Sequence, residues 1–121
     1  MQIAFRNHIQ KNLPFLKGKE LLLAVSGGID SVVLAHLMKK LKYNISLAHC
    51  NFGLRGKESN KDEQFVIALG KQLNVPTYTI QFDTENHSIQ HKISTQMAAR
   101  ELRYNWFQKL CLQNKLDYIL T

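Results

Sequence analysis

Cysteine is scarce in this sequence. The chain of 121 residues has only Cys50 and Cys111, and it contains no CxxC pair and no Cys/His spacing typical of a metal site. This usage argues against a disulfide-stapled domain and predicts reduced thiols in a reducing compartment. Both cysteines are therefore expected to be small, buried, apolar residues.

Long apolar runs are also lacking. No stretch approaches the roughly 20 residues that a membrane-spanning helix needs. The first 15 residues, MQIAFRNHIQKNLPF, have neither a long apolar core nor a small-residue cleavage site, so they do not form a signal peptide. We expect a cytoplasmic protein of one domain, able to bury roughly two thirds of the surface that its unfolded chain exposes.

Acidic residues are few relative to basic ones. The 9 Asp and Glu residues stand against 16 Lys and Arg residues, which gives a net charge of +7. Such an excess favours polyanionic partners, nucleic acid foremost. Charge alone leaves open a basic domain that binds no nucleic acid.

Helix-like and strand-like patterns alternate along the chain. Apolar spacing predicts helices over residues 3–16, about 32–41, 65–73 and 98–111, and strands over 21–25, 44–48, 75–82 and from 117 onward. Residues 51–60 are predicted to be a loop, and residues 83–92 to be irregular. This alternation indicates an α/β fold, a Rossmann-like, doubly wound parallel sheet with helices on both faces.

A glycine-containing segment joins the first predicted strand to the following helix. It reads Ser26-Gly27-Gly28-Ile29-Asp30-Ser31. The glycines let the backbone approach a ligand and adopt conformations that a side chain would block. The helix start offers unpaired N–H groups and a partial positive charge, and the two serines add hydroxyl donors. The segment therefore predicts an anion-binding loop.

Asp30 is unusual in such a loop because a carboxylate repels phosphate groups. A bridging Mg²⁺ reverses that repulsion, since Mg²⁺ commonly joins a carboxylate to phosphates. The sequence thus predicts that Asp30 is a metal ligand. The simpler alternative is a tight strand–helix turn in which Asp30 stabilises the helix dipole.

Two familiar phosphate-binding motifs are absent, the Walker loop GxxxxGK[ST] and the dinucleotide fingerprint GxGxxG. The hexapeptide instead resembles the SGGxDS pyrophosphate loop (PP-loop) of the ATP pyrophosphatase superfamily. The resemblance implies an adenine nucleotide alpha hydrolase-like fold. It also implies an enzyme that splits ATP between its α and β phosphates and adenylates an oxygen of its substrate.

A second segment indicates which branch of the superfamily is meant. This segment resembles the HxNHGLR…S…D…F stretch of the tRNA(Ile)-lysidine synthetase family. It reads His49-Cys50-Asn51-Phe52-Gly53-Leu54-Arg55 and continues to Ser59, Asp62 and Phe65. Phe52 departs from that pattern, which has histidine there. The resemblance implies that His49 and Asn51 help to form the nucleotide pocket, and that Arg55 contacts the α-phosphate or the RNA backbone. The alternatives are that His49 is only a strand-end residue, that Asn51 forms a turn and that Arg55 is a solvated loop residue.

A third segment is similar to the ARxxRYxWF helix of the same family. It contains Arg100, Arg103, Tyr104 and Trp106. The two arginines are three positions apart and share a helix face, and the family pattern implies catalytic contacts with ATP or the target nucleotide. The alternative is a solvated basic face paired with Glu101 and Lys109. Tyr104 is able to stack on a base, and Trp106 is expected in the core.

The family resemblance implies a complete reaction. Lysine is attached to C2 of the wobble cytidine of tRNA(Ile) with a CAU anticodon, through an adenylated tRNA, with ATP and Mg²⁺ required. Residues 1–121 would be the N-terminal ATP-binding domain, truncated in its fourth strand and lacking downstream tRNA-binding domains. We expect such a fragment to be inactive alone.

Two other functions stay open at this stage. One is a tRNA thiolase of the 2-thiocytidine type, which needs cysteines or an iron–sulfur cluster near its active site; Cys50 is close to the end of the second strand but has no partner cysteine nearby. The other is a non-catalytic nucleotide-binding module, which shares the layered α/β fold but uses a different glycine pattern.

Overall fold

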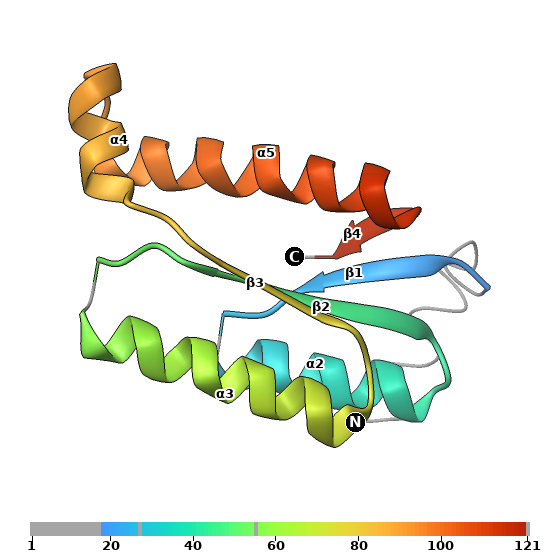
Figure 1. The fold of residues 1–121 in the computed structure, drawn as a ribbon. Helices are drawn as coiled ribbons and strands as arrows, with labels where there is room; N and C mark the ends of the chain where they lie inside the picture. Colours follow the sequence, from blue (N-terminus) through green and yellow to red (C-terminus); the bar gives the residue numbers. More distant parts are fainter. Residues whose placement is uncertain (1–17, 27, 55, 121) are drawn as a thin grey trace.

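The computed structural model describes residues 18–26, 28–54 and 56–120 (Figure 1). The helix predicted over residues 3–16 lies outside the described residues, as do Gly27 and Arg55. In chain order the elements are β1 (Glu20–Ala24), α2 (Ile29–Lys40), β2 (Asn44–Asn51), α3 (Lys57–Leu73), β3 (Thr77–Gln81), α4 (Thr84–His91), α5 (Thr95–Asn114) and β4 (Tyr118–Leu120). No helix in these ranges is long and apolar enough to cross a membrane.

The four strands form one parallel sheet in the order β3-β2-β1-β4. From β1 the chain moves to β2 and then to β3 through α2 and α3, which cover one face of the sheet (Figure 1). It then crosses back to the other side of β1 through α5, which covers the opposite face. The predicted doubly wound α/β fold is confirmed. The direction in which successive strands are added to the sheet reverses between β1 and β4. Sheets of this kind bind ligands at that point, beyond the carboxyl ends of the strands.

Two apolar clusters explain why β1 is a continuous apolar run. Leu21 and Leu23 pack on the face covered by α2 and α3, with Met38, Leu47 and Val66. Leu22 points to the opposite face and packs with Phe107 and other residues of the α5 layer. All three leucines are fully buried. A strand covered on both faces needs apolar side chains at every position, because successive side chains alternate between the faces.

The structure differs from the sequence prediction most clearly between residues 83 and 92. This polar stretch forms the helix α4 instead of an irregular segment. The Asp83 side chain caps the helix by accepting a hydrogen bond from the Asn86 N–H at 3.3 Å, and the Ser88 hydroxyl donates to the Glu85 carbonyl at 2.7 Å. Local capping of this kind starts a helix without an apolar stripe.

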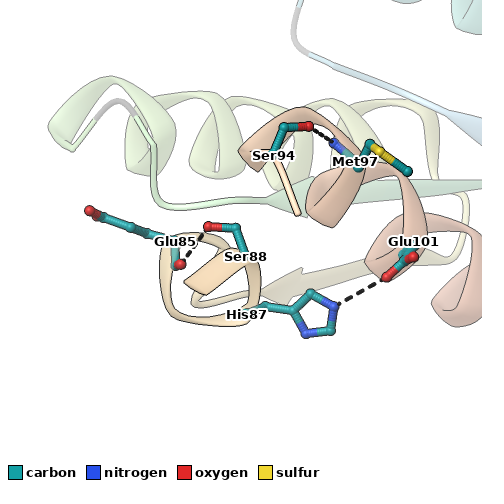
Figure 2. A network of polar contacts seen from close by, with 6 residues as sticks. All are labelled: Glu85, His87, Ser88, Ser94, Met97 and Glu101. Atoms are coloured by element: carbon teal, nitrogen blue, oxygen red, sulfur yellow. Dashed lines mark hydrogen bonds and ion pairs between the residues drawn. The ribbon is translucent and has the colours of Figure 1, made fainter. Parts of the chain in front are cut away.

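Helix α4 also contacts the N-terminal half of α5 (Figure 2). His87 Nε2 lies 3.5 Å from Glu101 Oε2, and the Ser94 hydroxyl caps α5 by accepting from the Met97 N–H at 3.1 Å. Glu101 thus pairs with α4, and the sequence-based alternative in which it pairs with the arginines of α5 is not what the structure shows.

Two boundaries within the second motif also differ from the prediction. Strand β2 extends to Asn51 because its last residues continue in register with Ile80 and Gln81 of β3. Helix α3 begins at Lys57, inside the predicted loop 51–60, directly after Gly56, which has a φ of 53°. Both shifts bring polar residues of the second motif onto regular elements and so fix their positions.

Gly70 marks a close contact between α3 and β3. A Cβ atom added there would overlap Thr77 Oγ1 and lie 2.9 Å from Thr77 Cβ. We expect Gly70→Ala to lower the free energy of unfolding by about 1–3 kcal/mol, because the overlap outweighs the better helix propensity of alanine. Urea denaturation measures this change. Lys71→Ala, at the next and exposed position, is the control, and equal stability of the two variants would contradict the prediction.

Candidate nucleotide-binding site

A cavity of about 600 Å³ opens at the carboxyl ends of the strands. Its size falls within the range of small-molecule sites. Its walls come from β1, β2 and the helices on both faces: Ala24, Val25, Ser26, Asp30, Ser31, Leu34, Ala48, His49, Cys50, Asn51, Phe52, Leu54, Ser59, Asp62, Arg103 and Phe107. The fold therefore brings together residues of all three sequence motifs.

The loop between β1 and α2 forms one end of this cavity. The Gly28 N–H donates to Ser26 Oγ at 3.3 Å, and the Ser31 hydroxyl donates to the Gly28 carbonyl at 3.0 Å. Gly28 is the N-cap residue of α2 and provides no side-chain cap, so the first N–H groups of the helix are not capped by a side chain. Together with two hydroxyl groups, they are the kind of donors that the predicted anion-binding loop requires.

The conformation of Gly28 differs from one sequence-based expectation. Its φ of −77° and ψ of 161° are extended backbone that any residue adopts. A Cβ atom at this position would have only Ser26 Oγ, at 3.4 Å, within ordinary contact distance. The expectation that Gly28 is needed for a conformation closed to other residues is therefore wrong. The remaining reason for glycine is the space that it leaves for a ligand.

His49 lies at the carboxyl end of β2 and is 5% exposed. Its Nδ1 atom lies 2.7 Å from the carbonyl oxygen of Val25, the residue just before the loop. Since a carbonyl only accepts hydrogen bonds, Nδ1 carries the proton and donates. The ring is thereby fixed beside the anion-binding loop.

Asn51 also lines the cavity, and its amide is hydrogen-bonded within the protein. Its Nδ2 donates to Asn60 Oδ1 at 2.9 Å, and its Oδ1 accepts from the Gly53 N–H at 3.0 Å. Asn51 thus links the turn after β2 to helix α3. This geometry combines the turn-forming role with a place in the cavity wall.

The two arginines of α5 differ in position. Arg103 lines the cavity, with its guanidinium carbon 5.8 Å from the centre of the Phe107 ring. Arg100 is exposed and is not among the lining residues; its guanidinium carbon lies 5.8 Å from the centre of the Tyr104 ring. The helix carries two parallel arginine–aromatic pairs, an inner one at the cavity and an outer one at the surface.

The sequence did not predict the aromatic contacts that hold Phe52 in the cavity wall. Phe52, which stands where the resembled family has histidine, stacks on Phe82 with ring centroids 5.9 Å apart. Phe82 in turn meets the edge of Trp106 at 6.4 Å. Trp106 is half-buried against the α5-side core, as predicted. The departure at Phe52 is therefore explained by packing, which the local motif alone does not reveal.

Cys50 also lines the cavity, and burial raises the pKa of its thiol to about 12, although the nearby charge of Arg103 lowers it. The thiolate is the reactive form, so this shift predicts a weakly reactive thiol. In a Cys111→Ser variant, we expect iodoacetamide to label folded Cys50 far more slowly than the same cysteine in urea. Equal labelling rates in the two states would contradict this prediction. The measurement is mass spectrometry of timed samples.

The described residues contain no group of three or more His, Cys, Asp or Glu side chains able to hold a metal ion. Asp30, in the first turn of α2, nevertheless lines the cavity beside the hydroxyls of Ser26 and Ser31. One carboxylate is what Mg²⁺ takes from a protein when substrate phosphates supply further ligands. The site therefore fits a cation bound jointly with phosphates, and it does not fit one held by protein side chains alone.

The doubly wound sheet, the anion-binding loop after its first strand and the cavity at its carboxyl edge define a nucleotide-binding α/β domain. Residues 1–121 match the family described as the PP-loop domain. The chain belongs to this family, whose members use ATP.

Several curated relatives are tRNA(Ile)-lysidine synthases. That of Bacteroides thetaiotaomicron is 46% identical over 103 residues, which cover 85% of this chain and 24% of the relative. That of Porphyromonas gingivalis strain W83 is 42% identical over 124 residues, which cover 98% of this chain and 27% of the relative. The chain thus spans about a quarter of the length of the curated relatives that it matches.

Solved structures confirm the fold. The NH3-dependent NAD synthetase from Campylobacter jejuni, in complex with the nitrate ion, has a TM-score of 0.66 and 23% identity, covering 93% of this chain and 52% of the other. NMN synthetase from Francisella tularensis has a TM-score of 0.70 and 19% identity, covering 97% and 51%. Both place this chain in the adenine nucleotide alpha hydrolase-like fold.

Proposed function

We propose that this chain is the ATP-using part of a cytoplasmic enzyme that attaches lysine to C2 of the wobble cytidine in tRNA(Ile) with a CAU anticodon. The main support is a cavity lined by Ser26, Asp30 and Ser31 of the loop together with His49 and Arg103, in a chain 46% identical to a tRNA(Ile)-lysidine synthase. The net charge of +7 suits a polyanionic RNA substrate.

The proposed reaction has two steps. The C2 oxygen of cytidine attacks the α-phosphorus of ATP, and the bond to pyrophosphate breaks. The amine of lysine then attacks C2, the C2–oxygen bond breaks and AMP leaves, while the amine gives up its proton. Both steps depend mainly on positioning the reactants and stabilising the charge that develops on phosphate oxygens.

The described residues suit these tasks. Ser26, Ser31 and the N–H groups at the start of α2 would bind the pyrophosphate, and Gly27 belongs to the same loop. Ile29 is 81% exposed, so it contributes its place in the backbone and no buried contact. Asp30 would hold Mg²⁺ together with the phosphates, which neutralises charge on the leaving group.

Arginines would complete the site. Arg103 lines the cavity, and we propose that it stabilises negative charge on the α-phosphate. Arg100 lies outside the cavity, so we assign it to the target nucleotide or its neighbours. Arg55 belongs to the second motif, and we keep the proposal that it contacts a phosphate of ATP or RNA.

We also propose that lysine ligation needs more than these 121 residues. The curated relatives are about four times as long, which leaves room in them for tRNA-binding domains. The chain alone is then expected to bind ATP without ligating lysine. Lysine incorporation into tRNA(Ile) by the chain alone would contradict this proposal.

Mass spectrometry of tRNA(Ile) from cells depleted of the full-length protein tests the function. We expect unmodified cytidine to accumulate at the wobble position. Unchanged lysidine would refute the proposal. Loss of a 2-thiocytidine would instead indicate a thiolase, for which the weakly acidic Cys50 thiol gives no support.

A further inference from the structure

One nitrogen of His49 has no partner in the described part of the chain. The Nδ1 atom donates to the Val25 carbonyl at 2.7 Å, whereas the Nε2 atom is buried and makes no hydrogen bond. The side chain is 95% buried and belongs to the wall of the cavity. A buried polar atom without a partner is unfavourable, so such an atom in a residue of the cavity wall indicates a group that a ligand completes.

In the neutral ring, the bond at Nδ1 determines which ligand groups can pair with Nε2. With the proton held on Nδ1, the neutral ring presents Nε2 as a hydrogen-bond acceptor. The phosphate oxygens of ATP are also acceptors, so they cannot pair with it. The hydrogen-bond donors of ATP are its ribose hydroxyls and the adenine amino group, all of them on the nucleoside.

The position of His49 in the sheet agrees with this assignment. The anion-binding loop follows β1, and His49 lies at the carboxyl end of the neighbouring strand β2. In dinucleotide-binding sheets, an acidic side chain following the loop by about 20 residues accepts a hydrogen bond from a ribose hydroxyl. His49 offers an acceptor at a similar place without adding negative charge near the phosphates.

We propose that His49 Nε2 accepts a hydrogen bond from a donor group of the bound nucleoside and so sets the nucleoside specificity of the site. This inference rests on the proposed function, because it takes ATP as the ligand. His49 is then a specificity-determining residue that contacts the nucleoside, separate from the loop residues that contact the phosphates.

The test compares nucleotides that lack one donor each. Dissociation constants are measured by titration calorimetry with Mg²⁺ for ATP, 2′-deoxyATP, 3′-deoxyATP and purine riboside triphosphate, which has no amino group. We expect one of the three analogues to bind the chain about tenfold or more weakly than ATP. The identity of that analogue shows whether the donor is the 2′-hydroxyl, the 3′-hydroxyl or the amino group.

A His49→Asn variant links the discrimination to this residue. The asparagine amide nitrogen can occupy the place of Nδ1 and keep the bond to Val25, while the acceptor at Nε2 is lost. We expect His49→Asn to bind ATP and the weak analogue with the same affinity. His36→Asn makes the same substitution at an exposed histidine of α2 that does not line the cavity, and it is the control, which should keep the discrimination of the unaltered chain.

Two results would overturn the inference. One is equal binding of all four nucleotides by the unaltered chain, and this outcome does not depend on any variant folding. The other is full discrimination by a folded His49→Asn variant. Failure of the chain to bind any of these nucleotides would instead count against the ATP site of the proposed function.

Discussion

Replacing Asp30 with asparagine is expected to weaken Mg²⁺-dependent ATP binding by about 100-fold, which corresponds to about 2.8 kcal/mol of binding free energy. The amide has nearly the same size but carries no charge, so it cannot hold the cation against the phosphates. Asp30 is exposed in the first turn of α2, and losing its interaction with the helix dipole should cost no more than about 1 kcal/mol of stability. Titration calorimetry with and without Mg²⁺ measures the binding.

The sign of the effect should reverse when Mg²⁺ is removed. Without the cation, the Asp30 carboxylate repels the phosphates, so Asp30→Asn should bind metal-free ATP as well as or better than the unaltered chain. Glu58→Gln is the matched control, because Glu58 is also exposed in the first turn of a helix but does not line the cavity. An Asp30→Asn variant with unchanged Mg²⁺ dependence would contradict the metal-binding role.

The second large effect is expected at Gly28. Gly28→Ala should fold normally, because the backbone is extended there and the added methyl group has room beside Ser26. Its stability should equal or exceed that of the unaltered chain by up to about 1 kcal/mol, since alanine restricts the unfolded chain. The same methyl group would occupy space that the pyrophosphate needs, so ATP affinity should fall by about tenfold to 100-fold, which corresponds to about 1.4–2.8 kcal/mol.

Gly70→Ala is expected to have the opposite effects on stability and ATP affinity. It should destabilise the fold by contact with Thr77 while leaving the loop and the cavity wall in place. Urea denaturation and ATP titration on both variants therefore separate a glycine needed for packing from one needed for a ligand. If Gly28→Ala bound ATP as tightly as the unaltered chain, the loop would not approach the pyrophosphate closely.

The sequence predicted the sheet well because its signals are local. The run Leu21–Leu23 is apolar at every position, as a strand buried on both faces requires, and the loop that follows has a distinctive composition. Helix α4 was missed because no apolar stripe marks it; its stability comes from the cap at Asp83 and from contact with α5. Tertiary contacts of this kind cannot be read from a local pattern.

In the candidate site, too, local features were predictable from the sequence and tertiary contacts were not. The sequence placed Arg100 and Arg103 on one helix face, and the helix confirms this. The distance of each arginine from the strand ends depends on how α5 lies across the sheet, and only the structure shows that Arg103 lines the cavity. The stacking of Phe52 on Phe82 likewise joins residues from two strand ends, so no motif in one segment could reveal it.

The residue just before the loop has a consequence for how nucleotides bind. The Val25 N–H donates to the Ala48 carbonyl at 2.9 Å, and the Val25 carbonyl accepts from His49 at 2.7 Å. Val25 is thus held on both sides by β2, and α2 already fixes the chain from Ile29 onward. Because β2 and α2 hold both flanks of the loop before any ligand binds, a phosphate group bound by Ser26 and Ser31 would cost little conformational entropy, and more of the contact energy would appear as affinity.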